Sequence, residues 1–561
     1  MVQVHGGAKV KRRGGALCKY PKNLGGEKKK MKTKNKKAIS TLIAVTIAFS
    51  ILVAFSATAS AATTWYVNTT GNDTTGDGSA GNPWKTITHA LTQVSAGDTI
   101  IVGPGTYVEW TGAVSAGCAV QVPWYAEGAG GLTIQSSDGP ENTIIDCGWA
   151  GSGVNIVSNN ITFEGFTVKN AYSVINQVSA KGHTLSNLII TDFVNYGLGV
   201  AHGVDCQFSD ITIHTNDVSK SADRTVKGID FIGYGSGGNN NCQFEDITIY
   251  DIETTGTYGT SFGIYWSTSS TYPDWDNTFT DVTIHDLSAE NWMACGIYIK
   301  GRAPGTTPYA IENTLFSGGS IYNIGSDAAA TRGFYVDGGC KGLSISGFDI
   351  SGCDKGIYFS HHGQEACNNV DIHCNNIVGN TEYGVQDYNG DNDVDATQNW
   401  WGDTSGPSGV GPGTGDAVST NVDFDPWSFT PDPCETKTLG FWKNHEDSVD
   451  ALGYPILLGD YSVEDFEDAQ DVFNNAKNKN ANTMLAAQLL AAKLNVAHLE
   501  HLDIDYCECI DDVIDDADVI LIDNGYEGPD TPGTAPRGEA KDDVNEIKDD
   551  LDEYNQGLCP C

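Results

Sequence analysis

Between residues 163 and 377, the chain repeats a short pattern in which apolar residues alternate with small or polar ones. The eight residues 206–213 (CQFSDITI) return almost unchanged at 242–249 (CQFEDITI). Alternation with a period of two is typical of a strand with one buried face. Each copy of this pattern therefore predicts a strand. The copies begin at Phe163, Leu185, Phe208, Phe244, Phe279, Phe316, Ile345 and Ile372.

A second pattern runs in phase with the first. It consists of a glycine, an apolar residue, an outward-facing residue and a further residue that is most often apolar. Two strands therefore recur in a fixed order within units of 22 to 37 residues. Units of this length cannot bury an apolar face alone and must stack on one another. The copies begin at Gly197, Gly228, Gly263, Gly296, Gly333, Gly356 and Gly384.

The shortest unit fits one coil of a parallel β-helix, and the longer units fit the same coil with inserted loops. Equivalent letters then occupy equivalent positions on successive coils. This arrangement predicts that Phe208, Phe244 and Phe279 are neighbours in one internal stack.

Two segments at the ends of the repeats carry a family resemblance. Residues 64–107 (TWYVNTTGND…GPGTY) resemble the opening of secreted right-handed parallel β-helix proteins of the pectin-lyase-like class, and 393–427 (DVDATQNWWG…DFDPW) resemble a closing coil. The resemblance implies an all-β solenoid, a right-handed single-stranded parallel β-helix, over 63–430, with an N-terminal cap and a short helix. It implies no single activity, because this fold carries lyases, hydrolases, epimerases, adhesins and envelope proteins.

Residues 431–561 predict a second domain. The segments TLGFWKNH (438–445) and MLAAQLLAAKLNVA (484–497) resemble a small domain of unassigned role that is appended to exported prokaryotic proteins. The alanine- and leucine-rich stretch 484–500 predicts an amphipathic helix, and 463–475 and 541–554 predict two more. The expected domain is acidic, mainly α-helical and rich in cysteine.

The N-terminus predicts export. Basic residues at 32–37, an apolar run at 38–55 and small residues at 56–62 form a secretory signal over 31–62, cut near Ala61. An archaeal pilin-class signal is the alternative, and it would leave an apolar membrane anchor. Residues 1–30 are expected to be an untranslated or non-structural extension before Met31.

Charge excludes some partners. The chain has a net charge of −40; without 1–62, it keeps 19 basic and 71 acidic residues, a net charge of −52. Nucleic acid is not an expected partner, because phosphate binding requires a basic face.

Fourteen cysteines remain after residue 62, nine in the β-helix and five in the C-terminal domain. Because both numbers are odd, either one disulfide crosses between the domains or each domain offers a free thiol. Cys206 and Cys242 are candidates for a cross-coil disulfide, or else two small buried side chains. The remaining candidates are Cys507, Cys509, Cys559 and Cys561, which suit disulfides in an exported chain or, alternatively, a metal.

Residues that follow the second strand fall on one side of the predicted rod. Polysaccharide cleavage requires paired carboxylates, or a base beside a group that neutralises a sugar acid. The catalytic candidates on successive coils are Lys300, Arg302, Asp337, His361 and Glu365.

The outward position of the second strand is occupied by Tyr265, Tyr298, Tyr335 and Tyr358. These four rings either contact a glycan or a neighbouring subunit, or stack on one another as aromatic residues do on strands.

The segment 387–395 (DYNGDNDVD) alternates oxygen-bearing side chains. Asp387, Asn389, Asp391 and Asp393 are candidate calcium ligands, although the loop lacks the glycine and the closing glutamate of an EF-hand. The alternative is a turn-rich coil end. No cofactor is required by the sequence; calcium is the one candidate.

Two functions fit these features. The first is a secreted cell-surface protein of an archaeal type of envelope, structural or glycan-contacting and non-catalytic, of the surface-layer, sheath or adhesin kind. Its partners would be copies of itself, other envelope proteins or a polysaccharide. The alternative is an extracellular polysaccharide lyase or glycoside hydrolase acting on the side of the β-helix.

Overall fold

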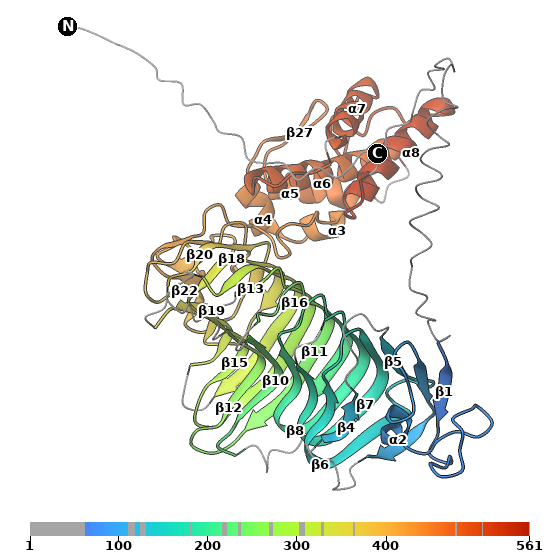
Figure 1. The fold of residues 1–561 in the computed structure, drawn as a ribbon. Helices are drawn as coiled ribbons and strands as arrows, with labels where there is room; N and C mark the ends of the chain where they lie inside the picture. The colour runs from blue at the N-terminus through green and yellow to red at the C-terminus, as the bar shows by residue number, and fades with distance from the viewer. Residues whose placement is uncertain are drawn as a thin grey trace, which may run out of the picture. The chain divides into compact units, whose positions relative to one another are not determined.

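The computed structural model describes residues 62–109, 118–123, 131–178, 181–215, 222–233, 237–268, 273–301, 309–326, 330–362, 365–476, 480–507 and 509–559. The predicted extension 1–30 and the signal segment up to residue 61 lie outside the described residues, as do Arg302 and Cys561. In the described part, 26 strands form one sheet, and its named strands pair in parallel (Figure 1). The predicted β-helix is therefore confirmed.

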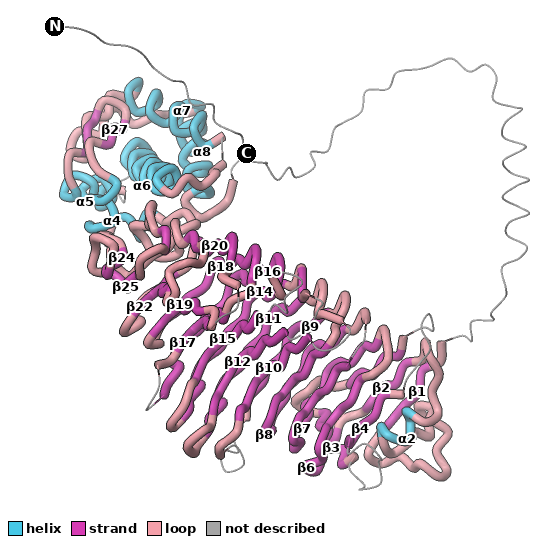
Figure 2. Tube along the Cα trace, turned by 60° about the vertical axis from the view of Figure 1, so that its left-hand side comes forward, coloured by secondary structure: helices cyan, strands magenta, loops and turns pink. Residues whose placement is uncertain are grey.

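Each coil of the β-helix has three sides. In β7 (Ile161–Val178) and β8 (Thr184–Ala201), one long bent strand supplies all three: Phe163 pairs with Leu185 on the first side, Val168 with Ile190 on the second and Ile175 with Leu198 on the third. Figure 2 shows the strands stacked in successive layers.

The other strands keep the same rows. The first and second sides contain β1 (Thr64–Val67), β2 (Thr99–Val102), β3 (Gly105–Val108), β5 (Leu132–Ser136), β9 (Gln207–His214), β11 (Gln243–Thr254), β13 (Asp274–Trp275), β14 (Thr278–Ala289), β16 (Ile311–Ser326), β18 (Cys340–Ile350), β20 (Asn368–His373), β21 (Asn376–Ile377), β23 (Val394–Asp395) and β26 (Val422–Asp423). The third side contains β4 (Cys118–Val122), part of β6 (Thr143–Ile156), β10 (Thr225–Gly233), β12 (Thr260–Thr268), β15 (Ala294–Gly301), β17 (Arg332–Asp337), β19 (Lys355–Ser360), β22 (Tyr383–Asp387), β24 (Pro407–Gly409) and β25 (Gly415–Val418).

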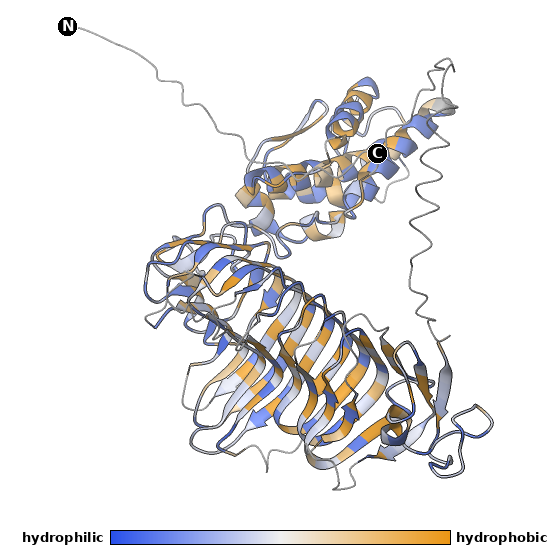
Figure 3. Ribbon diagram, in the orientation of Figure 1, coloured by the Kyte–Doolittle hydropathy of each residue, from blue (hydrophilic) through white to orange (hydrophobic). Residues whose placement is uncertain are grey.

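The interior is built from stacked side chains of one kind. Phe244 pairs with Phe208 on one coil and with Phe279 on the next, and both ring pairs have centroids 4.5 Å apart. Phe316 continues the stack at 4.6 Å from Phe279. Hydrophobic and hydrophilic residues alternate along these strands (Figure 3). The internal stack predicted from the repeated CQFxDITI sequence is thus confirmed.

The bend between the first and second sides has its own stack. Asp210, Asp246 and Asp281 occupy it with φ of 52°, 54° and 52°. Aspartate tolerates this left-handed region better than most residues. The next coil has Gly318, with φ of 73°, where an added Cβ would clash with the Asp281 carboxylate. These aspartates therefore serve the turn geometry.

Residues 431–561 form a second hydrophobic cluster around α6 (Ala481–His501). Expected helices are found as α5 (Phe466–Asn475), α6 and α8 (Glu539–Tyr554). The cluster's other elements are α3 (Leu439–Trp442), α4 (Glu446–Leu452), α7 (Ile510–Asp523), β27 (Ile456–Leu458) and β28 (Tyr461–Val463). The one helix described outside this cluster, α2 (Ile87–Leu91), lies in the N-terminal cap of the β-helix.

The structure corrects one expectation for α6. This helix is buried on nearly all sides, with alanines and leucines such as Ala487, Leu490 and Ala491 fully covered. A helix that is apolar all round is a central helix, whereas an amphipathic helix lies at a surface. Across the described residues, no helix is long and apolar enough to cross a membrane.

Candidate functional site

The third side of the β-helix carries one row of outward-facing tyrosines. The strand register pairs Tyr265 with Tyr298, Tyr298 with Tyr335 and Tyr335 with Tyr358. Successive ring centroids lie 5.3, 4.7 and 5.2 Å apart. We call Tyr265, Tyr298, Tyr335 and Tyr358 the tyrosine row. Asp230 precedes it, and Gln386 follows it.

The repeated Gly-Ile-Tyr sequence positions this row. Ile264 and Ile297 point into the core, so the tyrosine that follows each points outward. The glycine before each isoleucine stands at a close approach of two coils: a Cβ on Gly263 would lie 2.6 Å from the Gly296 carbonyl oxygen. Glycine is required there because no side chain fits.

The tyrosine rings are largely covered. Tyr298, Tyr335 and Tyr358 are 6%, 7% and 7% exposed, and Tyr265 is half-buried. Burial raises the pKa of Tyr335 to about 12 and that of Tyr298 well above its usual range, with the nearby Asp337 charge as a second cause. The rings therefore stack mainly on one another, and a ligand on this side would meet their edges and the side chains around them.

Basic side chains flank the tyrosine row. The Arg332 guanidinium lies 4.8 Å from the Tyr335 ring centroid and 4.7 Å from that of Tyr358. Lys227 lies 4.3 Å from the Tyr265 centroid. These distances are within the range of cation–π attraction.

Two of the flanking lysines also pair with acids. The Lys227 ammonium lies 2.8 Å from Asp230, and Lys355 forms an ion pair with Glu382. Burial raises the pKa of Asp230, and Lys227 opposes that rise.

Asp337, at the end of β17, is the centre of a polar network. Its Oδ2 accepts a hydrogen bond from the Tyr298 hydroxyl at 3.1 Å, and its Oδ1 lies 2.9 Å from Nδ1 of His362. The Ser360 hydroxyl lies 3.2 Å from the same His362 nitrogen. Asp337 is buried, whereas the His362 side chain is 67% exposed. The network therefore connects a covered carboxylate to an imidazole at the surface.

The structure brings together only some of the predicted catalytic residues. Lys300 and Asp337 lie on adjacent coils at equivalent positions, since the residues before them, Ile299 and Val336, are paired. The main-chain carbonyl oxygen of Glu365 accepts a hydrogen bond from the Gly339 nitrogen, and the Glu365 side chain is exposed. Arg302 lies outside the described residues.

The structure does not bring His361 to Asp337; the neighbouring His362 takes that place. His361 instead lies 3.1 Å from Asp391, and its main-chain nitrogen donates to Asn389. Strand β19 ends at Ser360, and His362, two residues further on, keeps the outward side that alternation from Tyr358 and Ser360 gives. The sequence signal that could have identified His362 is the same alternation, counted from Tyr358 through Ser360.

The calcium candidates are engaged separately. Asp387 accepts hydrogen bonds from Asn392, and Asp393 accepts one from the Asn369 nitrogen. Among the described residues, the group of side chains that could surround a metal does not include any of these four candidates. The turn-rich alternative fits this segment.

The disulfides explain why each of the two parts has an odd number of cysteines. Cys374 of the β-helix is bonded to Cys434 at the start of the C-terminal domain, so one disulfide crosses between the two parts. Cys507 is bonded to Cys559, and Cys509 is also disulfide-bonded. The sulfurs of Cys507, Cys509 and Cys559 lie close enough for a metal, but the structure uses them in disulfides.

Cys206 and Cys242 are buried cysteines, not joined by a disulfide, in contact on adjacent coils. The proposed cross-coil disulfide is therefore not formed, and the alternative of small buried side chains applies. Burial and the neighbouring Cys206 raise the pKa of the Cys242 thiol.

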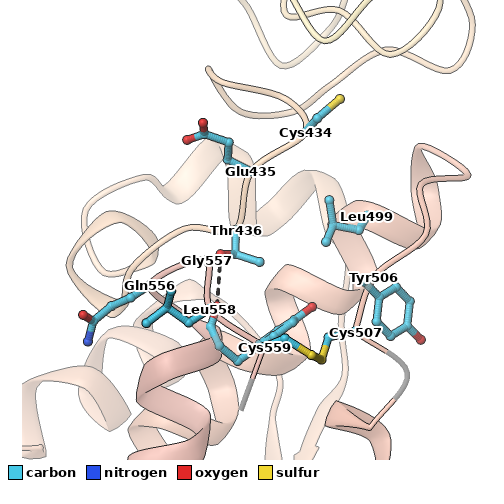
Figure 4. Close-up of a pocket in the computed structure, with 11 residues that line it drawn as sticks. Cys434, Glu435, Thr436, Leu499, Tyr506, Cys507, Gln556, Gly557, Leu558 and Cys559 are labelled. Atoms are coloured by element: carbon cyan, nitrogen blue, oxygen red, sulfur yellow. Dashed lines mark hydrogen bonds between the residues drawn. A yellow bond between two sulfur atoms is a disulfide. The ribbon is translucent and has the colours of Figure 1, made fainter. Parts of the chain in front are cut away.

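A cavity of about 440 Å³ lies in the C-terminal domain (Figure 4). Leu499, Tyr506 and Leu558 form its apolar walls, and the Cys507–Cys559 disulfide borders it. Its size is that of a small-molecule site. Sequence reasoning did not anticipate it, because its walls come from three segments far apart in the sequence, within 434–436, 499–507 and 554–559.

Residues 69–250 match a family described as "Protein of unknown function (DUF1565)". The match begins in the cap and ends in β11. No curated protein matches the chain.

Several solved structures are similar to the chain. A rhamnogalacturonan lyase is 14% identical over 65% of this chain and 88% of its own, with a TM-score of 0.29. A pectate lyase is 15% identical over 66% and 79%, with a TM-score of 0.32. An alginate lyase from Paenibacillus sp. is 14% identical over 51% and 96%, with a TM-score of 0.24. At these values, the chemistry must be argued from the chain's own residues.

Proposed function

We propose that this chain is an exported cell-envelope protein whose third side contacts a glycan without cleaving it. The observation that carries the proposal is the repetition of one outward-facing row over successive coils: Tyr265, Tyr298, Tyr335 and Tyr358 recur once per coil in exact strand register. A surface that repeats in one dimension suits a partner that repeats in one dimension, such as a polysaccharide or a lattice of identical subunits.

The distribution of basic residues also favours the third side as the contact surface. Between 64 and 430, the structure describes nine Lys and Arg residues, in a chain with a net charge of −40. Four of these nine lie on outward rows of the third side: Lys227, Lys300, Arg332 and Lys355. The third side thus concentrates hydrogen-bond donors in a protein whose remaining surface is acidic.

The polar network supports a non-catalytic role. Both oxygens of Asp337 are already engaged, one with Tyr298 and the other with His362. A carboxylate held in this way orients its neighbours and has limited capacity to act on a substrate itself.

The cross-domain disulfide changes what the proposal predicts for assemblies. Because Cys374 and Cys434 satisfy each other, neither domain must offer a thiol to a neighbouring molecule. We expect envelope assemblies to resist reductant and to yield to denaturant or to digestion of the glycan.

Fractionation of native cells tests this proposal. The chain should sediment with the envelope, begin near residue 62 by peptide mass spectrometry, and stay bound when only reductant is added. Recovery only from the culture medium or only from the cytoplasm would contradict the envelope role.

A second candidate function rests on His362. Its Nδ1 is held by a buried carboxylate while the ring is 67% exposed, and this geometry suits a general acid or base. In this reading, Asp337 orients the imidazole, and Lys300 on the adjacent coil stabilises negative charge on the sugar.

Two neighbouring histidines make a matched pair for testing this activity. Glycan cleavage should fall by about a hundredfold or more in His362→Asn, while His361→Asn should keep it. Absence of new reducing or unsaturated sugar ends from acidic and neutral glycans, with the native chain, would exclude the enzyme reading.

A further inference from the structure

Three exposed aromatic side chains lie along the corner where the second side turns into the third: Tyr258 and Trp292 on successive coils, and Tyr172 three coils before Tyr258. Tyr172, Tyr258 and Trp292 are 41%, 68% and 51% exposed. Tyr258 and Trp292, from successive coils, have ring centroids 6.4 Å apart. We call these three residues the aromatic corner. Contiguous exposed aromatic surface on a soluble protein marks a binding site more often than chance exposure does.

The loops that carry the aromatic corner are tied to one another across coils. The Asp223 carboxylate accepts a hydrogen bond of 3.0 Å from the Tyr258 main-chain nitrogen. The Glu290 carboxylate accepts from the nitrogen of Gly256 at 2.9 Å. These cross-coil bonds fix the loop conformations before any ligand arrives, and so they lower the entropic cost of binding.

Trp292 is held in a similar way, since the hydroxyl of Ser326, on the coil beyond, donates to its carbonyl at 2.6 Å. The backbone under the largest exposed ring is thus anchored from the adjacent coil, while the ring itself stays at the surface.

The corner also presents polar groups beside its rings. The Arg224 guanidinium donates to the Tyr172 hydroxyl at 3.2 Å and lies 5.4 Å from that ring's centroid. The carboxylates of Asp223 and Glu290 are exposed next to Tyr258. A ring face with hydrogen-bonding groups at its edge matches a pyranose, which has an apolar face and a rim of hydroxyls.

The net charge of the aromatic corner favours uncharged sugars over acidic ones. Two carboxylates and one guanidinium leave the corner net negative, within a chain of net charge −40. An acidic polysaccharide would be repelled there, whereas an uncharged one would not.

We propose that the aromatic corner is a binding site for uncharged hexose units of the envelope glycan. This inference rests on the proposed glycan contact and identifies the sugar class and the residues that hold it. Tyr258 and Trp292 stack on the sugar faces, and Arg224, Asp223 and Glu290 bond to hydroxyls.

Binding of the full chain to glycans tests the inference. The probes are neutral polymers (a mannan and a β-glucan), acidic polymers (polygalacturonate and alginate) and polysaccharide extracted from the native envelope, compared by affinity electrophoresis and calorimetry. The native chain should bind a neutral polymer with little dependence on salt. The double variant Tyr258→Ala/Trp292→Ala should bind about tenfold more weakly or worse.

Trp275→Ala is the matched control, since Trp275 is 44% exposed on β13 and lies outside the corner. It should leave affinity unchanged. Equal binding by the native chain and the double variant would overturn the inference but spare the proposed function. Preference of the native chain for acidic polymers would also overturn it. Failure of the native chain to bind any probe, envelope polysaccharide included, would count against both.

Discussion

The β-helix and the C-terminal domain are stabilised by different means. Inside the β-helix, identical side chains stack from coil to coil, as Phe208, Phe244 and Phe279 do, and eight of the described cysteines are buried without forming disulfides. In residues 431–561, unlike segments pack around α6, and Cys507 and Cys559 are covalently joined. One part depends on repetition and the other on a few unique contacts.

This difference predicts how much of each part is destabilised when one contact is lost. In a stacked array, each coil contacts only its neighbours, so a lost contact weakens a local block of coils. In a small helical cluster, every element contacts the central helix, so a lost contact destabilises the whole cluster. The following variants and conditions test this contrast.

The largest effect is expected from Phe244→Ala. Removing a ring from the middle of the stack leaves a cavity and should cost about 3 to 5 kcal/mol. Hydrogen exchange should accelerate in β9, β11 and β14, while β1 and β2 keep their protection. Uniform loss of protection over all coils would show that the β-helix unfolds as one unit.

Loss of the cross-domain disulfide should have the next largest effect. Cys374 and Cys434 are separated by 60 residues, and opening that loop in the double variant Cys374→Ala/Cys434→Ala should cost up to about 4 kcal/mol. Calorimetry should show an earlier transition for the C-terminal part, and the transition of the first coils should stay in place. A shift of both transitions by the same amount would contradict the separation of the two parts.

Acid should affect the C-terminal domain through His498. Burial lowers the pKa of His498 to about 4 from 6.5, and the charges of Lys437 and His501 act in the same direction. The folded state then resists protonation that the unfolded state accepts. The resulting stability is fully present above pH 6.5 and is lost as the pH falls toward 4, by about 3 kcal/mol.

His498→Gln tests this account, because glutamine does not titrate. The difference in unfolding free energy between the native chain and the variant should shrink as the pH falls from 6.5 to 4. A difference that stays constant over this range would show that His498 is not the titrating group.

The smallest effect is expected at the β-helix thiols. Burial raises the pKa of Cys147 and of Cys295 to about 12, so neither presents a thiolate near neutral pH. Iodoacetamide at pH 8 should leave them unmodified in the folded protein and modify them in denaturant. Cys242→Ala should cost only about 1 kcal/mol, because it removes one small buried atom.

Most of the β-helix could be predicted from the sequence because its geometry is repeated. Once the copies of FxDITI and GIYx are aligned, the stack of Phe244 and the row of Tyr298 both follow from period-two alternation. The C-terminal domain offered no such repetition: α7 was not predicted, although Ile510, Ala517 and Leu521 give it a buried apolar stripe between its aspartates, and α6 was expected at a surface.

The candidate site was predicted in part. Asp337 ends a strand, and its position followed from alternation. His362 lies two residues beyond Ser360 on the side that alternation gives, but the first histidine of the pair was chosen as the candidate instead. The aromatic corner was missed because Tyr258 and Trp292 belong to loops of different length, which the repeat does not align. The disulfide between Cys374 and Cys434 was one of two options that counting alone could not separate.

The cross-domain disulfide also decides how the protein responds to pulling. Tension applied to residues 435–561 passes through the sulfur bridge into the coil that contains Cys374. The final coils, between Cys374 and Cys434, form a closed loop outside that path and carry no load. A chain under tension therefore cannot be unwound from its C-terminal end until the bridge is reduced, and traction must instead separate coils nearer the N-terminus.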